Sequence, residues 1–244
     1  MATKNTNILT WKDAEAVSVA AAHFFIADCH RCIARRGRFI VALSGGNTPK
    51  RLYQLLATPE FSNNIPWNKI FLFLSDERFV PYTDADSNYR MIKENLLDHI
   101  SIPEKNIFPV PVNGTAKKCA KVYEATIKDF FNNKKPVIDF LLLGVGDDGH
   151  TASLFPGTDI LKEKKKLVKE VWVEAKQTFR ISFTLPFINK AAQIIFLVAG
   201  KEKATVVSDI VHHKKIKPAL PAQLVNPVKG NVCWMIDKEA AVKT

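Results

Sequence analysis

The sequence predicts an α/β fold with a doubly wound, mostly parallel sheet, formed as a single domain over residues 1–244. Three observations favour this fold class. Short, nearly continuous apolar runs alternate with helix-like segments, a pattern typical of parallel strands that helices cover on both faces. No low-complexity linker or internal repeat divides the chain. The composition, 47% hydrophobic and 24% charged, is that of a globular protein able to bury a sizeable core.

The predicted elements follow one another in a regular order. Strands are expected at 38–43, 69–74, 107–112, 137–144, 193–199 and 232–236. Helices are expected from near Asp13, at 49–57, 87–100, 115–131 and 202–211, with a further short helix that begins near His150. Two more strand-like runs lie at 167–174 and 180–185, so a small antiparallel extension is expected around 167–190.

The N-terminal region contains an apolar run at 17–26 that faintly resembles a signal peptide. Glu15, His23 and Asp28 interrupt that pattern, and an amphipathic helix explains it better. No run reaches the length needed to span a membrane. We therefore expect a cytoplasmic protein that makes no membrane contact.

The net charge of +11 raises the question of a nucleic-acid partner. Much of the excess positive charge lies at 162–169 and 212–217, and neither run interleaves aromatic residues or belongs to a helix-turn-helix or RNA-binding signature. A basic balance also suits an enzyme that attracts anionic substrates. No nucleic-acid partner is expected.

The chain has four cysteines, Cys29, Cys32, Cys119 and Cys233. A disulfide framework is not expected in a chain of this size without an export signal. The Cys29-x-x-Cys32 pair lies inside a predicted helix, and no second Cys/His pair with ligand spacing accompanies it. No metal site is expected, and the role of the pair stays open.

Four polar runs each follow a predicted strand. They are Ser44 to Thr48, Ser75 to Arg78, Gly144 to His150 and Gly200 to Lys203. The carboxyl ends of parallel strands lie at one edge of a sheet, which is where open α/β sheets bind their ligands. The four runs are therefore expected to meet in one crevice.

The first run, Ser44-Gly45-Gly46-Asn47-Thr48, is a glycine-bearing turn into a helix. Thr48 is expected to cap that helix and Pro49 to occupy its first position. Backbone N–H groups beside paired glycines can bind an anion or a sugar. A tight turn without a ligand is the alternative. Next along the chain, Asp76 and Arg78 flank Glu77, and either a functional cluster or a structural ion pair is consistent with them.

The run at 144–149 formally matches G-x-G-x-x-G, the dinucleotide fingerprint. We reject that interpretation because Asp147 and Asp148 would place negative charge where the pyrophosphate should lie. His150 follows at an expected helix start, a position that favours a neutral imidazole and suits a general base. Asp148 either orients that imidazole or caps the helix. Further on, Arg180 and Lys203 supply cations suited to a phosphate dianion.

Several longer runs together resemble one family. They are ALSGGNTP (42–49), SDERFVP (75–81), SNYR (87–90), LLGVGDDGHTASLFPG (142–157), RISFT (180–184), GKEKA (200–204) and LPAQLV (220–225). They span nearly the whole chain, which thus resembles the 6-phosphogluconolactonases, within a larger group that includes glucosamine-6-phosphate deaminases.

The resemblance implies a NagB-like, Rossmann-like fold and hydrolysis of 6-phospho-D-glucono-1,5-lactone in the oxidative pentose phosphate pathway. It implies no metal or organic cofactor and a functional link to glucose-6-phosphate dehydrogenase. By position, His150 would be the general base, and Asp76 and Arg78 would line the reacting end. Arg180 and Lys203 would hold the 6-phosphate, helped by the turn at 44–48.

One position distinguishes this chain from the deaminases that it resembles. Those enzymes carry a glutamate just before the Pro-Gly of this loop, where this chain has Phe155. An aldose–ketose isomerisation needs an acid–base set that moves protons, whereas ester hydrolysis needs one base and one group that stabilises the oxyanion. Phe155 therefore favours lactone opening. A deaminase or isomerase, or a sugar-phosphate-binding module without catalysis, remains the alternative.

Overall fold

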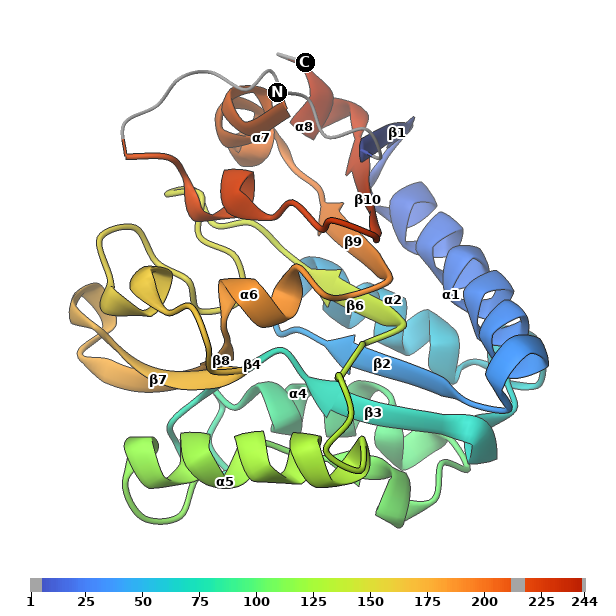
Figure 1. The fold of residues 1–244 in the computed structure, drawn as a ribbon. Coiled ribbons are helices and arrows are strands. Elements are labelled where there is room, and N and C mark those ends of the chain that lie inside the picture. The colour runs from blue at the N-terminus through green and yellow to red at the C-terminus, as the bar shows by residue number, and fades with distance from the viewer. Residues whose placement is uncertain (1–5, 212–217, 243–244) are drawn as a thin grey trace.

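A seven-stranded parallel sheet forms the centre of the computed structural model, which describes residues 6–211 and 218–242 (Figure 1). The strands lie in the order β1 (Thr6–Trp11), β10 (Asn231–Asp237), β9 (Gln193–Val198), β6 (Phe140–Leu143), β2 (Phe39–Leu43), β3 (Ile70–Leu74) and β5 (Ile107–Phe108). From β2 the chain builds outward through β3 to β5, and then returns to β6 on the other side of β2. The strand order therefore reverses between β2 and β6, which confirms the doubly wound prediction.

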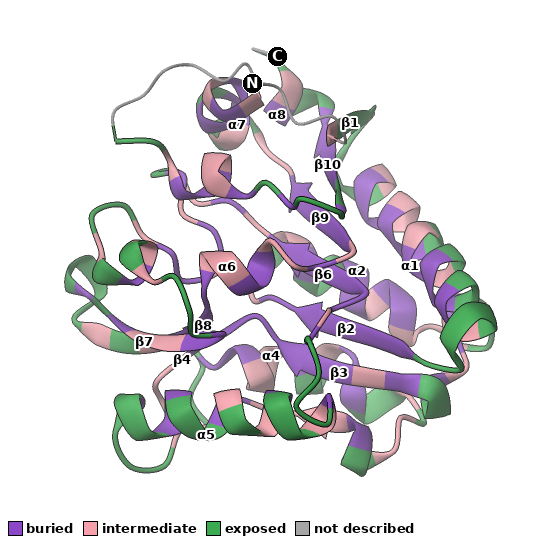
Figure 2. Ribbon diagram, in the orientation of Figure 1, coloured by how far each residue is buried: buried purple, intermediate pink, exposed green. Residues whose placement is uncertain are grey.

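The central strands are buried along their whole length. All residues of β2, β6 and β9 are buried, and Figure 2 shows this as a continuous band through the middle of the molecule. Apart from Gln193 at the start of β9, these strands are apolar, because helices and loops cover both of their faces. This explains why continuous apolar runs were the right signal for these three elements.

The helices pack on the sheet and on one another. They are α1 (Ala14–Arg36), α2 (Asn47–Ala57), α3 (Pro59–Ser62), α4 (Asn88–Asn95), α5 (Ala116–Phe130), α6 (Leu185–Ile188), α7 (Ala204–Val211) and α8 (Lys238–Ala241). The Asp13 side chain caps α1, and Gly37 ends that helix in the left-handed conformation. α1 packs against α2, and α2 against α4. In Figure 1, α6 lies in front of the sheet and α2 behind it.

A second, antiparallel sheet of three strands adjoins the first. β8 (Thr178–Phe183) lies between β4 (Asp76–Arg78) and β7 (Val168–Val173), and α5 packs on β7 and β8. The expected antiparallel extension is thus confirmed, although β4 was expected as a loop. Ser75 joins the two sheets, since its N–H donates to Leu43 O and its carbonyl accepts from Phe183 N–H.

Several predicted boundaries need correction. The strand β1 was missed because it is an edge strand with mostly exposed residues and no apolar alternation. The helix expected at 87–100 ends at Asn95, and the strand expected at 107–112 ends at Phe108. No helix begins near His150, because the chain there turns through positive φ at Gly149 and Ala152 and closes a bridge between Thr151 and Leu154.

The helix α1 is long and apolar enough to cross a membrane by length and composition alone, so the expectation that no run reaches that length was wrong for this segment. Eight of its residues are buried, and it packs on β2, β9 and β10. This is the behaviour of a core helix. Of the two basic runs, the one at 162–169 has four exposed lysines but buries Leu167 and Val168, and the one at 212–217 lies outside the described residues.

Candidate active site

A cavity of about 450 Å³ opens at the carboxyl ends of β2, β6 and β9. The four polar runs expected to converge all contribute to its wall, as do β4 and β8. The predicted site residues that line it are Ser44, Gly45, Gly46, Asn47, Thr48, Asp76, Arg78, His150, Arg180 and Lys203. Asp148 does not line the cavity but contacts His150. The cavity thus lies where the strand order reverses, as the topology of doubly wound sheets requires.

The N-terminus of α2 forms one wall of the cavity. The helix begins at Asn47 with Gly46 as its N-cap, so the expectation that Thr48 caps the helix and Pro49 starts it was wrong. The φ of 118° at Gly46 suits only glycine, and no side chain caps this end. The first N–H groups of the helix are therefore left for an external acceptor, which makes this end suited to an anion.

The strand β4 divides its side chains between two faces. Asp76 and Arg78 line the cavity, while Glu77 lies between them on the opposite face and is fully buried. Glu77 accepts hydrogen bonds from the backbone N–H groups of Arg78, Asn88 and Tyr89, at 2.7, 2.7 and 2.8 Å. Burial raises the pKa of Glu77 to about 7, against the lowering effect of these bonds. Within the described ranges neither acidic residue of β4 forms an ion pair, so the structural ion pair left open by the sequence is not formed.

The carboxylate of Asp76 is fixed by two serines. Ser153 Oγ donates to Asp76 Oδ2 at 2.6 Å, and Ser75 Oγ donates to Oδ1 at 3.2 Å. Ser153 in turn donates its N–H to Ser182 Oγ on β8. These hydrogen bonds tie the loop that follows His150 to β4 and to β8.

Two arginines lie side by side on the antiparallel sheet. Arg78 of β4 pairs directly with Arg180 of β8 in the strand register, and both side chains line the cavity. Like charges at directly opposite positions destabilise a sheet. Burial lowers the pKa of Arg180, and its Nε has no hydrogen-bond partner in the described structure. An anion in the cavity would relieve this arrangement.

His150 lies in a tight loop after β6. Its Nδ1 lies 2.5 Å from Asp148 Oδ1, and its backbone N–H donates to the same oxygen at 3.1 Å. Partial burial acts to raise the pKa of Asp148, but the hydrogen bonds from His150 lower it overall. An ionised carboxylate only accepts, so Nδ1 is the nitrogen that donates to Asp148, and in the neutral tautomer with this proton Nε2 is the acceptor. Asp148 therefore orients the imidazole, and the capping alternative fails because no helix follows.

Two neighbours hold the imidazole ring in place. A Cβ at position 146 would lie 2.1 Å from the ring, so the ring packs directly on the backbone of Gly146. On another side Phe155 stacks on it, with 4.1 Å between the ring centroids and 23° between the planes. Arg180 lies 5.3 Å from the centroid of the same phenyl ring. Phe155 thus contacts both His150 and one of the two arginines.

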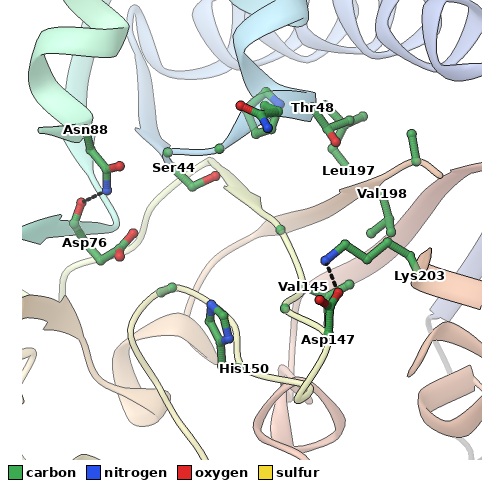
Figure 3. Close-up of a pocket in the computed structure, with 18 of the residues that line it drawn as sticks. Ser44, Thr48, Asp76, Asn88, Val145, Asp147, His150, Leu197, Val198 and Lys203 are labelled. Carbon is green, nitrogen blue, oxygen red and sulfur yellow. Dashed lines mark hydrogen bonds and ion pairs between the residues drawn. The ribbon is translucent and has the colours of Figure 1, made fainter. Parts of the chain in front are cut away.

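Lys203 approaches from the side of β9 and the short 3-10 segment Lys201–Lys203. Its Nζ lies 2.5 Å from Asp147 Oδ1. Figure 3 shows this pair on the opposite side of the cavity from Asp76 and Asn88, with His150 between them. The Asp147 side chain is 76% exposed, so an anion that binds Lys203 would compete with a weakly held partner.

Comparisons with known proteins agree with this geometry. The model of the family described as glucosamine-6-phosphate isomerases/6-phosphogluconolactonase matches residues 12–234. The chain belongs to this family.

Three relatives illustrate the family match. A 6-phosphogluconolactonase of Synechocystis is 40% identical over 86% of both chains. The human GDH/6PGL endoplasmic bifunctional protein is 37% identical over 86% of this chain but only 27% of its own length. The structure of the 6-phosphogluconolactonase from Trypanosoma cruzi superposes with a TM-score of 0.89 at 30% identity, covering 99% of this chain and 97% of that one.

Four polar or aromatic residues that line the cavity or contact its lining were not predicted as site residues: Asn88, Asp147, Ser153 and Phe155. Phe155 was noted only for the glutamate that it replaces, and its ring contacts have no sequence signal. Ser153 and Asn88 sit in the runs that carry the family resemblance. The available signal was that both are polar and lie in these runs, Ser153 three residues after His150 and Asn88 directly after Ser87.

The cysteines lie away from this cavity. All four are buried and free, and burial raises the pKa of Cys29 to about 12. A thiolate, the form that binds metals and attacks electrophiles, is therefore disfavoured there. Over residues 6–211 and 218–242 no group of three or more His, Cys, Asp or Glu side chains is arranged to hold a metal ion.

Proposed function

We propose that the chain hydrolyses 6-phospho-D-glucono-1,5-lactone to 6-phospho-D-gluconate, a step of the oxidative pentose phosphate pathway. One observation carries the proposal: a histidine oriented by Asp148 shares a cavity with two arginines that face each other across two strands. The histidine is a general base, and the arginines supply positive charge for a phosphate and a developing oxyanion. The family match and the names of the relatives support the same reaction.

The reaction begins with water. Nε2 of His150 takes a proton from a water molecule as its oxygen attacks C1 of the lactone. Arg78 stabilises the oxyanion of the tetrahedral intermediate, and Asp76 lines the same end of the cavity. The intermediate then collapses, the bond between C1 and the ring oxygen breaks, and the imidazolium returns the proton to that oxygen. The products are a carboxyl group at C1 and a free hydroxyl at C5.

The phosphate is bound away from the reacting carbon. We assign it to Arg180 and Lys203, with the turn at 44–48 and the N-terminus of α2 as further donors. Lys203 exchanges its contact with Asp147 for the phosphate. The two cationic side chains and the backbone N–H groups in this part of the cavity are suited to bind a phosphate dianion.

The deaminase alternative is disfavoured by Phe155. This phenyl ring fills the space beside His150 where the deaminases place a glutamate, so the acid–base set of an isomerisation is incomplete. A binding module without catalysis would leave the oriented His150–Asp148 pair without a use.

Two assays of the purified protein test the proposal. We expect hydrolysis of the phosphorylated lactone well above its spontaneous rate, and no release of ammonia from glucosamine-6-phosphate. A rate equal to the spontaneous background would overturn the proposal in favour of a binding module. Ammonia release would overturn it in favour of a deaminase.

We further propose a cytoplasmic enzyme that works without a metal or organic cofactor and without nucleic-acid or membrane partners. A functional link to glucose-6-phosphate dehydrogenase is part of this proposal. The name of the bifunctional human relative, of which this chain matches 27%, supports the link.

A further inference from the structure

Buried polar atoms without a partner gather in the active-site cavity. In the described part of the chain five buried side-chain atoms have no hydrogen-bond partner, and those of Ser44, Asn88 and Arg180 line this cavity. A buried polar group without a partner is costly, so each of the three cavity residues has a polar atom whose partner the described residues do not supply. Ser44 and Arg180 already belong to the proposed site. Asn88 has no role in it so far.

The orientation of the Asn88 side chain follows from its contacts. The side chain is 1% exposed, and Nδ2 donates to the backbone carbonyl of Asp76 at 2.9 Å. The opposite orientation would bring two oxygen acceptors together, so Oδ1 is the atom without a partner. Figure 3 shows this amide at the cavity wall beside Asp76. An acceptor needs a donor, and neither a phosphate dianion nor a lactone carbonyl offers one, whereas a sugar hydroxyl does.

The amide is also held firmly. The backbone N–H of Asn88 donates to the buried carboxylate of Glu77, and Ser87 caps the helix that begins here. A Cβ at Gly45 would lie 1.7 Å from Asn88 Oδ1, so the turn after β2 packs directly on this oxygen. Glycine at that position leaves the room that the amide needs. The acceptor is therefore preorganised, which is what selective recognition requires.

We propose that Asn88 is a substrate-binding residue whose Oδ1 accepts a hydrogen bond from the C2 hydroxyl of the sugar ring. The proposal rests on the proposed lactonase function. The C2 hydroxyl is the one next to the reacting carbon. Asn88 Nδ2 donates a hydrogen bond to the backbone carbonyl of Asp76, the residue that lines the reacting end. The residue distinguishes a hydroxylated lactone from a lactone that lacks this group.

The test compares two enzymes on two substrates. kcat/KM is measured for the wild type and Asn88→Ala with 6-phosphogluconolactone and with its 2-deoxy analogue. The wild type should prefer the parent lactone by about 10-fold or more, because the analogue leaves Oδ1 unpaired. In Asn88→Ala that preference should fall to less than about 2-fold, since the acceptor is gone.

Asn95→Ala is the matched control. Asn95 lies on the same helix, accepts from Gln54 at 2.9 Å and donates to Met91 O at 2.7 Å, and does not line the cavity. This variant should keep the wild-type preference. If Asn88→Ala lowers kcat/KM equally for both lactones, its role is structural and the inference is overturned. Absence of hydrolysis by the wild type would instead overturn the lactonase proposal, and this inference with it.

Discussion

The two sheets contribute to the cavity in different ways. The large parallel sheet presents loops and a helix end: the turn after β2, the His150 loop after β6 and the Lys203 segment after β9. The small antiparallel sheet presents charged side chains from the strands themselves, Asp76, Arg78 and Arg180. A strand that is buried on both faces rarely carries a charged side chain, whereas β4 directs Asp76 and Arg78, two residues apart, to its cavity face. The site thus combines His150 and Lys203 from the parallel-sheet side with Asp76, Arg78 and Arg180 from the antiparallel sheet.

The largest effect should come from the parallel-sheet side. His150→Gln removes the general base but keeps a polar side chain of similar size, so kcat should fall by about 10²–10⁴-fold. Steady-state hydrolysis corrected for the spontaneous reaction gives the value. His99→Gln, an exposed histidine outside the cavity, is the control and should retain full activity. Near-normal kcat in a folded His150→Gln protein would mean that His150 is not the general base.

The two faces of β4 should have different effects. Glu77 on the buried face should affect the stability of the protein, whereas Asp76 and Arg78 on the cavity face should affect its activity. Burial raises the pKa of Glu77 from 4.5 to about 7. The folded state therefore binds a proton more tightly than the unfolded state, and the stability that this provides is lost as the pH rises from about 4.5 through 7. The unfolding free energy of the wild type minus that of Glu77→Gln should therefore fall by up to ~3 kcal/mol between pH 5 and pH 8.

Urea unfolding of both proteins across this pH range measures the difference. Glu60→Gln, at an exposed position, should show no such trend. A difference that stays constant or grows with pH would contradict the assignment of a raised pKa to Glu77.

A smaller effect on activity is expected at Phe155, which contacts both His150 of the parallel-sheet side and Arg180 of the antiparallel sheet. Its ring stacks on His150, and the Arg180 guanidinium lies over the same ring. Phe155→Leu should therefore hold both side chains less firmly in position. Contacts of this kind contribute about 0.5–1.5 kcal/mol, so kcat/KM should fall about 3- to 10-fold. Phe179→Leu, on the same strand as Arg180 but in an edge-to-face contact with Trp172, should stay within about 2-fold. An unchanged rate in Phe155→Leu would mean that the ring does not position either residue.

The sequence predicted the parallel sheet well because burial on both faces leaves continuous apolar runs. It also predicted the convergence of the polar runs at 44–48, 75–78, 144–150 and 200–203, since this depends only on strand direction. It failed where structure depends on contacts between distant segments. The strand β4 has only three residues, and its identity is fixed by pairing with β8 rather than by its own residues.

Local signals also failed around His150 and α2. Glycine and alanine with positive φ keep the His150 loop from forming the helix that its neighbours suggested. At α2 a glycine N-cap replaces the threonine cap that propensity favours, because the end of this helix faces the cavity. In both cases the departure from ordinary propensity lies at the site itself, where function outweighs local preference.

The role of Arg180, the residue of the antiparallel sheet that we assign to the phosphate beside Lys203, can be tested with one comparison. KM and kcat are measured for 6-phosphogluconolactone and for unphosphorylated glucono-1,5-lactone, with wild type and Arg180→Ala. A lost charge-assisted contact should raise KM for the phosphorylated lactone by about 10- to 100-fold, with kcat nearly kept and little effect on the unphosphorylated one. An unchanged KM for the phosphorylated lactone, or an equal loss with both substrates, would contradict the account.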